Sequence, residues 1–226
     1  MSRIIIGVDD RERSEDAIAF GIALAREGGA AVTVAHVYPW GDLAHTGTRE
    51  YGEALLTDSE ELLQRISDRL RDVPDLQTRS LADSSPARAL QRLAEEQEAG
   101  LLVVGSCHTG RIGRVLPGST AERLLSGSQC AVAVAPTGYA GGKSHPPGVI
   151  ACGWDGRAES EAALGAAEEL AERLSASLRV IRVFEPLYHP NPLAIGVAYE
   201  AFKEGARRSA EPVSYTHLTL PTICSV

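Results

Sequence analysis

The sequence lacks any hydrophobic run that approaches the roughly 20 apolar residues of a transmembrane helix. The N-terminal stretch MSRIIIGVDD also lacks the features of a secretory signal peptide, because its apolar run is short and two acidic residues follow it at once. We therefore expect a cytoplasmic protein with no membrane partner.

Cysteine and lysine are scarce. The four cysteines form neither a Cys-x-x-Cys pair nor a zinc-binding spacing, which predicts reduced, unpaired thiols and no metal site. Only Lys143 and Lys203 are lysines, and the chain carries a formal net charge of -8. A general nucleic-acid binder needs a broad basic face to displace counterions from phosphates, so no nucleic-acid partner is expected.

What the sequence does contain is a regular alternation of short apolar runs and helical segments over residues 3–136. The apolar runs are RIIIGV, AAVTVAHVY, LQTRSLA, LLVVGS and CAVAVAP. The first helical segment has Ser14 as its expected N-cap and Gly28-Gly29 as its expected end. This alternation predicts an α/β fold, an open parallel sheet with helices on both faces.

The first strand–helix–strand pattern recurs after a Gly/Pro/Ser-rich stretch, at a constant offset that aligns Gly7 with Gly153 and Asp9 with Asp155. The second copy lacks a counterpart of the later glycine-bearing loop, so we expect it to be marginally stable alone and to hold no nucleotide. We predict a complete domain, a linker, an incomplete second domain and a non-native tail, over residues 1–137, 138–147, 148–212 and 213–226. A natural, divergent terminus is the alternative for the tail.

Ligands of an open parallel sheet lie beyond the carboxyl ends of its strands, where the strand order reverses. Asp9 and the loop from Gly105 to Ser119 follow the first and fourth predicted strands. Gly118 permits close approach of a ligand, and the helix that starts beside it favours an anion. These features are typical of a phosphate-binding loop, although this loop contains neither G-K-[ST] nor G-x-G-x-x-G.

The loop sequence GSCHTGRIGRVLPGS resembles the nucleotide-binding signature of the universal stress proteins. The markers IIIGVDD, VAHV and GSTAERLL extend this resemblance over residues 3–136, and to the front of the second copy. The resemblance implies a five-stranded sheet of order 3-2-1-4-5. It also implies a homodimer or intrachain pairing through the last strand, and ATP binding in one subset of members.

The resemblance further implies which residues meet the nucleotide. Asp9 would lie by the adenosine and Val37 by the adenine, while Gly118 and its neighbours would hold the phosphates. Arg111 and Arg114 would add positive charge. The candidate nucleotide-binding residues are Val8, Asp9, Val37, Gly105, Ser106, His108, Arg111, Arg114, Gly118, Ser119 and Thr120.

These observations favour a universal stress protein that binds ATP, with Mg²⁺, as a regulatory ligand in a stress response and is not an enzyme. A slow ATPase or phosphotransferase is one alternative, with Asp9, Asp10 and His108 as its only candidate bases or metal ligands. A nucleotide-free dimerising scaffold is the other, because His108 stands where the family signature has glycine.

Overall fold

The computed structural model describes residues 3–40, 49–107, 115–142 and 147–182. The chain divides into two compact units, Met1–Pro146 and Pro147–Val226, which are considered separately. No helix in the parts that the structure describes is both long and apolar enough to cross a bilayer.

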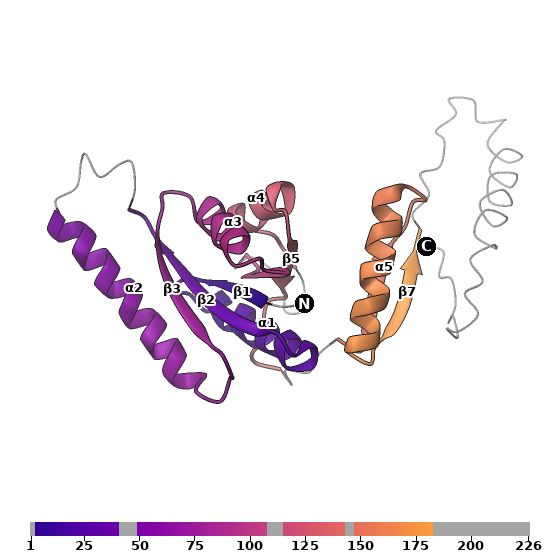
Figure 1. Ribbon diagram of the computed structural model, residues 1–226, viewed down its shortest axis with the longest axis horizontal. Coiled ribbons are helices and arrows are strands. Elements are labelled where there is room, and N and C mark those ends of the chain that lie inside the picture. Colours follow the sequence, from indigo (N-terminus) through magenta and orange to yellow (C-terminus); the bar gives the residue numbers. More distant parts are fainter. Residues whose placement is uncertain (1–2, 41–48, 108–114, 143–146, 183–226) are drawn as a thin grey trace, which may run out of the picture. The chain divides into compact units, whose positions relative to one another are not determined.

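The first unit holds one parallel sheet with the strand order β3-β2-β1-β4-β5 (Figure 1). Its strands are β1 (Arg3–Val8), β2 (Ala31–Tyr38), β3 (Gln77–Ala82), β4 (Leu101–Gly105) and β5 (Ala131–Ala135). Ile4, Ile5 and Ile6 are fully buried, as expected of a central strand covered on both faces. The predicted α/β fold and its strand order are confirmed.

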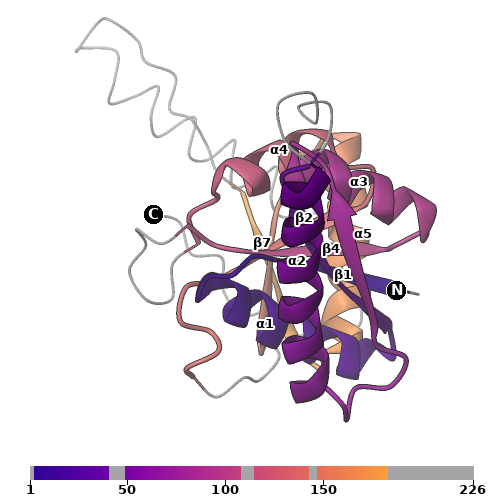
Figure 2. The same cartoon turned by 90° about the vertical axis from the view of Figure 1, so that its left-hand side faces the viewer.

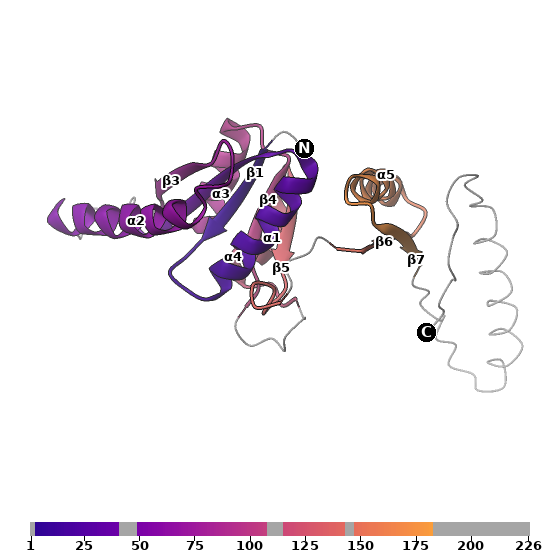
Figure 3. The same ribbon diagram turned by 90° about the horizontal axis from the view of Figure 1, so that it is seen from below.

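In the described part of the first unit, two helices cover each face of this sheet. They are α1 (Arg13–Gly28), α2 (Arg49–Arg69), α3 (Pro86–Glu96) and α4 (Ser119–Gly127). Figure 2 shows α2 along the β2–β3 side, and Figure 3 shows α1 across β1 and β4. Ile5 packs with residues of α3 and α4, whereas its neighbour Ile6 meets Gly21 of α1 on the opposite face.

The ends of α1 follow the sequence prediction only in part. Gly29 has a left-handed φ of 60°, and its N–H donates to the carbonyl of Ala25, so the predicted glycine end is confirmed. The prediction of Ser14 as N-cap was wrong. Glu12 occupies that position without a side-chain cap, and the Ser14 hydroxyl instead reaches back to Asp9.

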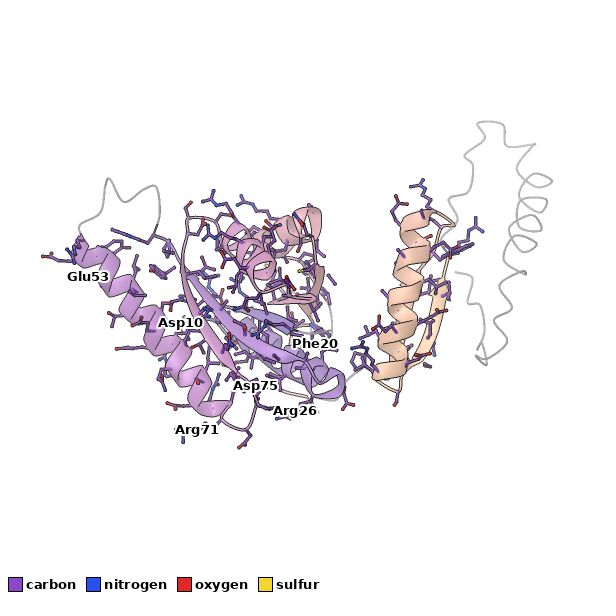
Figure 4. The ribbon with its side chains drawn as sticks, in the orientation of Figure 1. Asp10, Phe20, Arg26, Glu53, Arg71 and Asp75 are labelled. Carbon is purple, nitrogen blue, oxygen red and sulfur yellow. The ribbon has the colours of Figure 1, made fainter. Side chains whose placement is uncertain are left out.

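The segment after β5 is attached to α1. Asp16, which is only 8% exposed, accepts hydrogen bonds from the backbone N–H groups of Gly138 (2.9 Å) and Ala140 (2.8 Å). The ring of Tyr139 meets that of Phe20, labelled in Figure 4, edge to face with centroids 5.1 Å apart. The described beginning of the predicted linker is therefore packed into the first unit.

The second unit contains β6 (Val149–Gly153), α5 (Ala158–Arg173) and β7 (Ser177–Ile181) in its described part. Val149 pairs with Ser177 in the same parallel register in which Arg3 pairs with Ala31 in the first unit. The order and register of β1–α1–β2 are thus repeated. Its small core consists of Cys152, Leu164, Ala171 and Leu178.

Candidate functional site

A cavity of about 130 Å³ lies at the carboxyl ends of the strands of the first unit. The strand order reverses between β1 and β4, and residues that follow both strands line the cavity, as the sequence predicts. Most of the predicted site residues come together here: Val8, Asp9, Val37, Gly105, Gly118, Ser119 and Thr120. His108, Arg111 and Arg114 lie outside the described residues.

One wall of the cavity is apolar. Val37 comes from β2, Leu90 from α3 and Val104 from β4, and all three contribute to the core cluster between the sheet and α3. The alternation of side chains along each strand places these residues on the α3 face. A flat apolar group such as an adenine ring fits a wall of this chemistry.

The opposite end of the cavity is formed by the start of α4. Gly118 precedes the helix with φ -86° and ψ 174°, and no side chain caps the first turn. Among the residues that the structure describes, the nearest atom to a Cβ built on Gly118 is the Cβ of Cys107, at 4.0 Å. Neither backbone conformation nor packing requires glycine here, but the missing side chain leaves the uncapped N–H groups accessible from the cavity.

Gly105 differs from Gly118 in this respect. A Cβ at Gly105 would lie 2.4 Å from the carbonyl oxygen of Arg13, a distance that no side chain tolerates. The end of β4 therefore packs directly against the backbone at the start of α1. Close packing explains this glycine without a ligand, although its backbone also lines the cavity.

Ser106 closes the base of the loop that follows β4. Its hydroxyl donates to the carbonyl of Leu116 (3.0 Å) and accepts from the N–H of the same residue (2.7 Å), while the N–H of Cys107 donates to that carbonyl (2.7 Å). Ser106 is 2% exposed and does not line the cavity described above. Its hydroxyl therefore joins the two ends of the loop.

The side chain of Asp9 accepts three hydrogen bonds from residues that the structure describes. Arg13 donates to Oδ2 from both Nε (2.8 Å) and Nη2, and the Ser14 hydroxyl donates to Oδ1 (2.8 Å). Burial raises the pKa of Asp9, but these hydrogen bonds and the positive charges of Arg13 and Arg11 outweigh it, so the pKa lies below its ordinary value. Asp9 is therefore a carboxylate near neutral pH.

The sequence analysis missed Arg13 as a site residue. Its side chain lines the cavity, and it is the only cation among the described residues that do so. The four-residue spacing of Asp9 and Arg13 allows this ion pair, but Asp9 precedes α1, so the sequence alone does not predict that Arg13 faces the cavity.

A chain of polar side chains lies next to the site under α2. The Nδ1 atom of His36 is 2.8 Å from the hydroxyl oxygen of Ser59, which is 2.9 Å from that of Ser80. Burial lowers the pKa of His36, and the negative charges of Asp9 and Asp10 only partly offset this effect. Because Ser59 is fully buried, the pair cannot act as an exposed nucleophile and base.

The sequence matches the universal stress protein family over residues 1–136. The chain belongs to this family. A curated universal stress protein from Mycobacterium tuberculosis is 30% identical over 79% of this chain, and the chain spans 63% of that relative's length.

Two solved universal stress proteins from Archaeoglobus fulgidus are also similar. One covers 91% of this chain and 74% of its own, with 15% identity and a TM-score of 0.64, which shows a shared fold. The other, a complex with dAMP, covers 60% of this chain and 98% of its own, with 21% identity and a TM-score of 0.47. The bound dAMP belongs to that solved structure.

Proposed function

We propose that this universal stress protein binds ATP, together with Mg²⁺, as a regulatory ligand in the cavity of its first unit. The observation that carries the proposal is the pairing of an apolar wall with the uncapped start of α4. The wall suits a base, and the helix start suits an anion. The family signature, which in one subset of members accompanies ATP binding, supports the same ligand.

In this proposal the two ends of the cavity would set the orientation of the nucleotide. The adenine would lie against Val37, and the ribose near the ends of β1 and β4. The phosphates would lie at Gly118, where the N–H groups of Ser119 and Thr120 point along the helix axis toward an incoming anion. The hydroxyls of Ser119 and Thr120 add further donors.

Mg²⁺ would enter with the nucleotide. No cluster of three or more histidine, cysteine, aspartate or glutamate side chains suited to a metal occurs in the described ranges. Mg²⁺ is commonly bound through phosphate oxygens and water, with few protein ligands. The hydroxyls of Ser119 and Thr120 are oxygen ligands of the kind that this ion accepts. The ion would neutralise part of the phosphate charge.

The site supports binding better than turnover. A general base should have a pKa close to the operating pH. Asp9 is the only carboxylate among the described residues that line the cavity; its pKa is lowered, and it is held by Arg13 and Ser14. Such a group is a weak base, so the bound ATP would act by shifting the population of conformations or the affinity for a partner.

We propose that this protein pairs with a second copy, or with another repeat, through the edge of its sheet. β5 is the last strand of its sheet in the part that the structure describes, and its strand backbone groups on one side are not paired within that sheet. We expect pairing through β5, either with a second copy or within a longer arrangement of repeats.

Thermal unfolding of the full chain with ATP, AMP or adenosine, each with Mg²⁺, tests the proposal. At equal concentrations, a ligand that binds the folded state more tightly raises the Tm more, so ATP should raise it more than AMP. Phosphate release should stay at the rate of a protein-free solution over hours. Multiple turnovers would replace the regulatory proposal with the ATPase alternative, and an unchanged Tm with all three ligands would overturn nucleotide binding.

A further inference from the structure

We propose that Arg13 is the residue that binds the phosphates of the ligand, and that Asp9 is a positioning residue for Arg13. This inference deepens the proposed function and rests on it. It assigns the discrimination between nucleotides and nucleosides to a side chain outside the glycine-bearing loop.

The position of Arg13 satisfies the first requirement, access to the anion. Arg13 is the first residue of α1, its side chain is 31% exposed, and it lines the same cavity as Gly118 and Ser119. The α4 helix start supplies backbone donors to that cavity, and Arg13 supplies a guanidinium whose positive charge is partly offset by the paired Asp9 carboxylate. An anion in the cavity would lie between two sources of positive potential.

The second requirement is a fixed geometry. The backbone of Arg13 packs against Gly105, with no room for a Cβ between them. Its guanidinium donates twice to the Oδ2 atom of Asp9, and Ser14 holds the other carboxylate oxygen at 2.8 Å. An arginine held in this way has already lost much of its side-chain freedom, so binding an anion costs less conformational entropy.

The third requirement is spare hydrogen-bonding capacity. A guanidinium carries five N–H groups, and Asp9 engages only Nε and Nη2 of Arg13. The Nη1 atom makes no hydrogen bond to any residue that the structure describes. Arg13 can therefore keep its contact with Asp9 and still donate to a phosphate oxygen.

This arrangement gives Asp9 a role that differs from direct contact with the adenosine. If Asp9 bound the ribose, its loss would weaken ATP and adenosine alike. If Asp9 orients Arg13, its loss weakens ligands that carry phosphates and leaves adenosine unaffected. The same logic predicts that Arg13 contributes to the binding of inorganic triphosphate, which has no base or ribose.

The experiment measures equilibrium binding of ATP, adenosine and inorganic triphosphate to the full chain and to Arg13→Gln, Arg13→Lys and Asp9→Asn. Circular dichroism and the Tm report folding. Arg26→Gln is the matched control, because Arg26 is an exposed arginine near the other end of α1 (Figure 4).

We expect Arg13→Gln to weaken ATP and triphosphate binding by about 10- to 100-fold, as loss of a charged hydrogen-bond donor does. Arg13→Lys should keep part of the affinity, because lysine keeps the positive charge but lacks the paired N–H donors of the planar guanidinium. Asp9→Asn should weaken the same two ligands and leave adenosine unchanged, and Arg26→Gln should bind all three as the parent does.

Each other result has a definite meaning. Unchanged ATP binding by folded Arg13→Gln overturns the role of Arg13, and equal losses of ATP and adenosine in Asp9→Asn overturn the positioning role of Asp9. If the parent chain binds triphosphate through Arg13 but does not bind ATP, the proposed function is overturned and the role of Arg13 stands. Failure of the parent chain to bind either phosphate ligand overturns both.

Discussion

Gly105 at the end of β4 lies directly against the backbone of Arg13, whose carbonyl oxygen would be 2.4 Å from a Cβ at Gly105. Through this contact the end of β4, which precedes the glycine-bearing loop, packs against the start of α1. A change at either position should therefore affect both the stability of the first unit and the geometry of the site.

Gly105→Ala should lower the free energy of unfolding by about 1–3 kcal/mol, because the backbone of Arg13 has to move to admit a methyl group. Urea unfolding measures the loss. Gly28→Ala is the control, since a Cβ at Gly28 meets no atom of the described chain within 4 Å and the change should stay within about 1 kcal/mol. Equal stability of both variants would show that the contact does not constrain the fold.

Gly118→Glu should abolish ATP binding without unfolding the chain, because it places a carboxylate where the phosphates are proposed to lie. Gly118→Ala is its matched control: the backbone angles suit any residue, and a Cβ has ordinary room. We expect the alanine variant to retain ATP binding within about tenfold. ATP titration by calorimetry distinguishes the two, and unchanged affinity in folded Gly118→Glu would remove the phosphate site from this end of the cavity.

Asp16→Ala should release the segment after β5 from α1, because both N–H groups that Asp16 accepts from would lose their partner. The expected cost is about 1–3 kcal/mol, with faster protease cleavage between residues 138 and 147. Glu15→Ala serves as control, since Glu15 forms an exposed ion pair with Arg69, and such pairs contribute little. Identical cleavage rates in both variants would contradict the role of Asp16.

The stability of the chain should fall as the pH drops from about 7 to about 5, partly through His36. Burial lowers the pKa of His36 in the folded state, so the unfolded state binds the proton more readily below pH 6.5. The stabilisation that comes from keeping His36 neutral in the folded state is complete above the pKa of the unfolded state. It is lost as the pH falls below that pKa. His36→Gln should flatten this part of the profile, measured by urea unfolding at each pH; an unchanged slope would contradict the assignment.

The fold was largely predictable because its signals are local. Buried strands such as Ile4–Ile6 are short apolar runs, and Gly29 marks a helix end in a way that backbone sterics require. Ser14 shows the limit of local reasoning. A serine near a helix start predicts a cap, but the nearby carboxylate and backbone of Asp9 offered its hydroxyl other partners.

The candidate site was predicted where glycine and hydroxyl residues formed a recognisable spacing, and missed where the contact depends on packing. Arg13 reaches the cavity because Gly105 lets β4 approach α1, a relationship between residues far apart in the sequence. The hydroxyl of Ser106 likewise forms hydrogen bonds with the backbone of Leu116 across the loop, and no short sequence motif predicts this contact. The attachment of the segment after β5 by Asp16 is a third contact of this long-range kind.

Calorimetric titration of the full chain with ATP and Mg²⁺ tests the central claim most directly. The account predicts saturable binding of one ATP per chain, because only the first unit has the cavity between an apolar wall and the start of α4 in its described part. Absence of a saturable signal at millimolar ATP would contradict it.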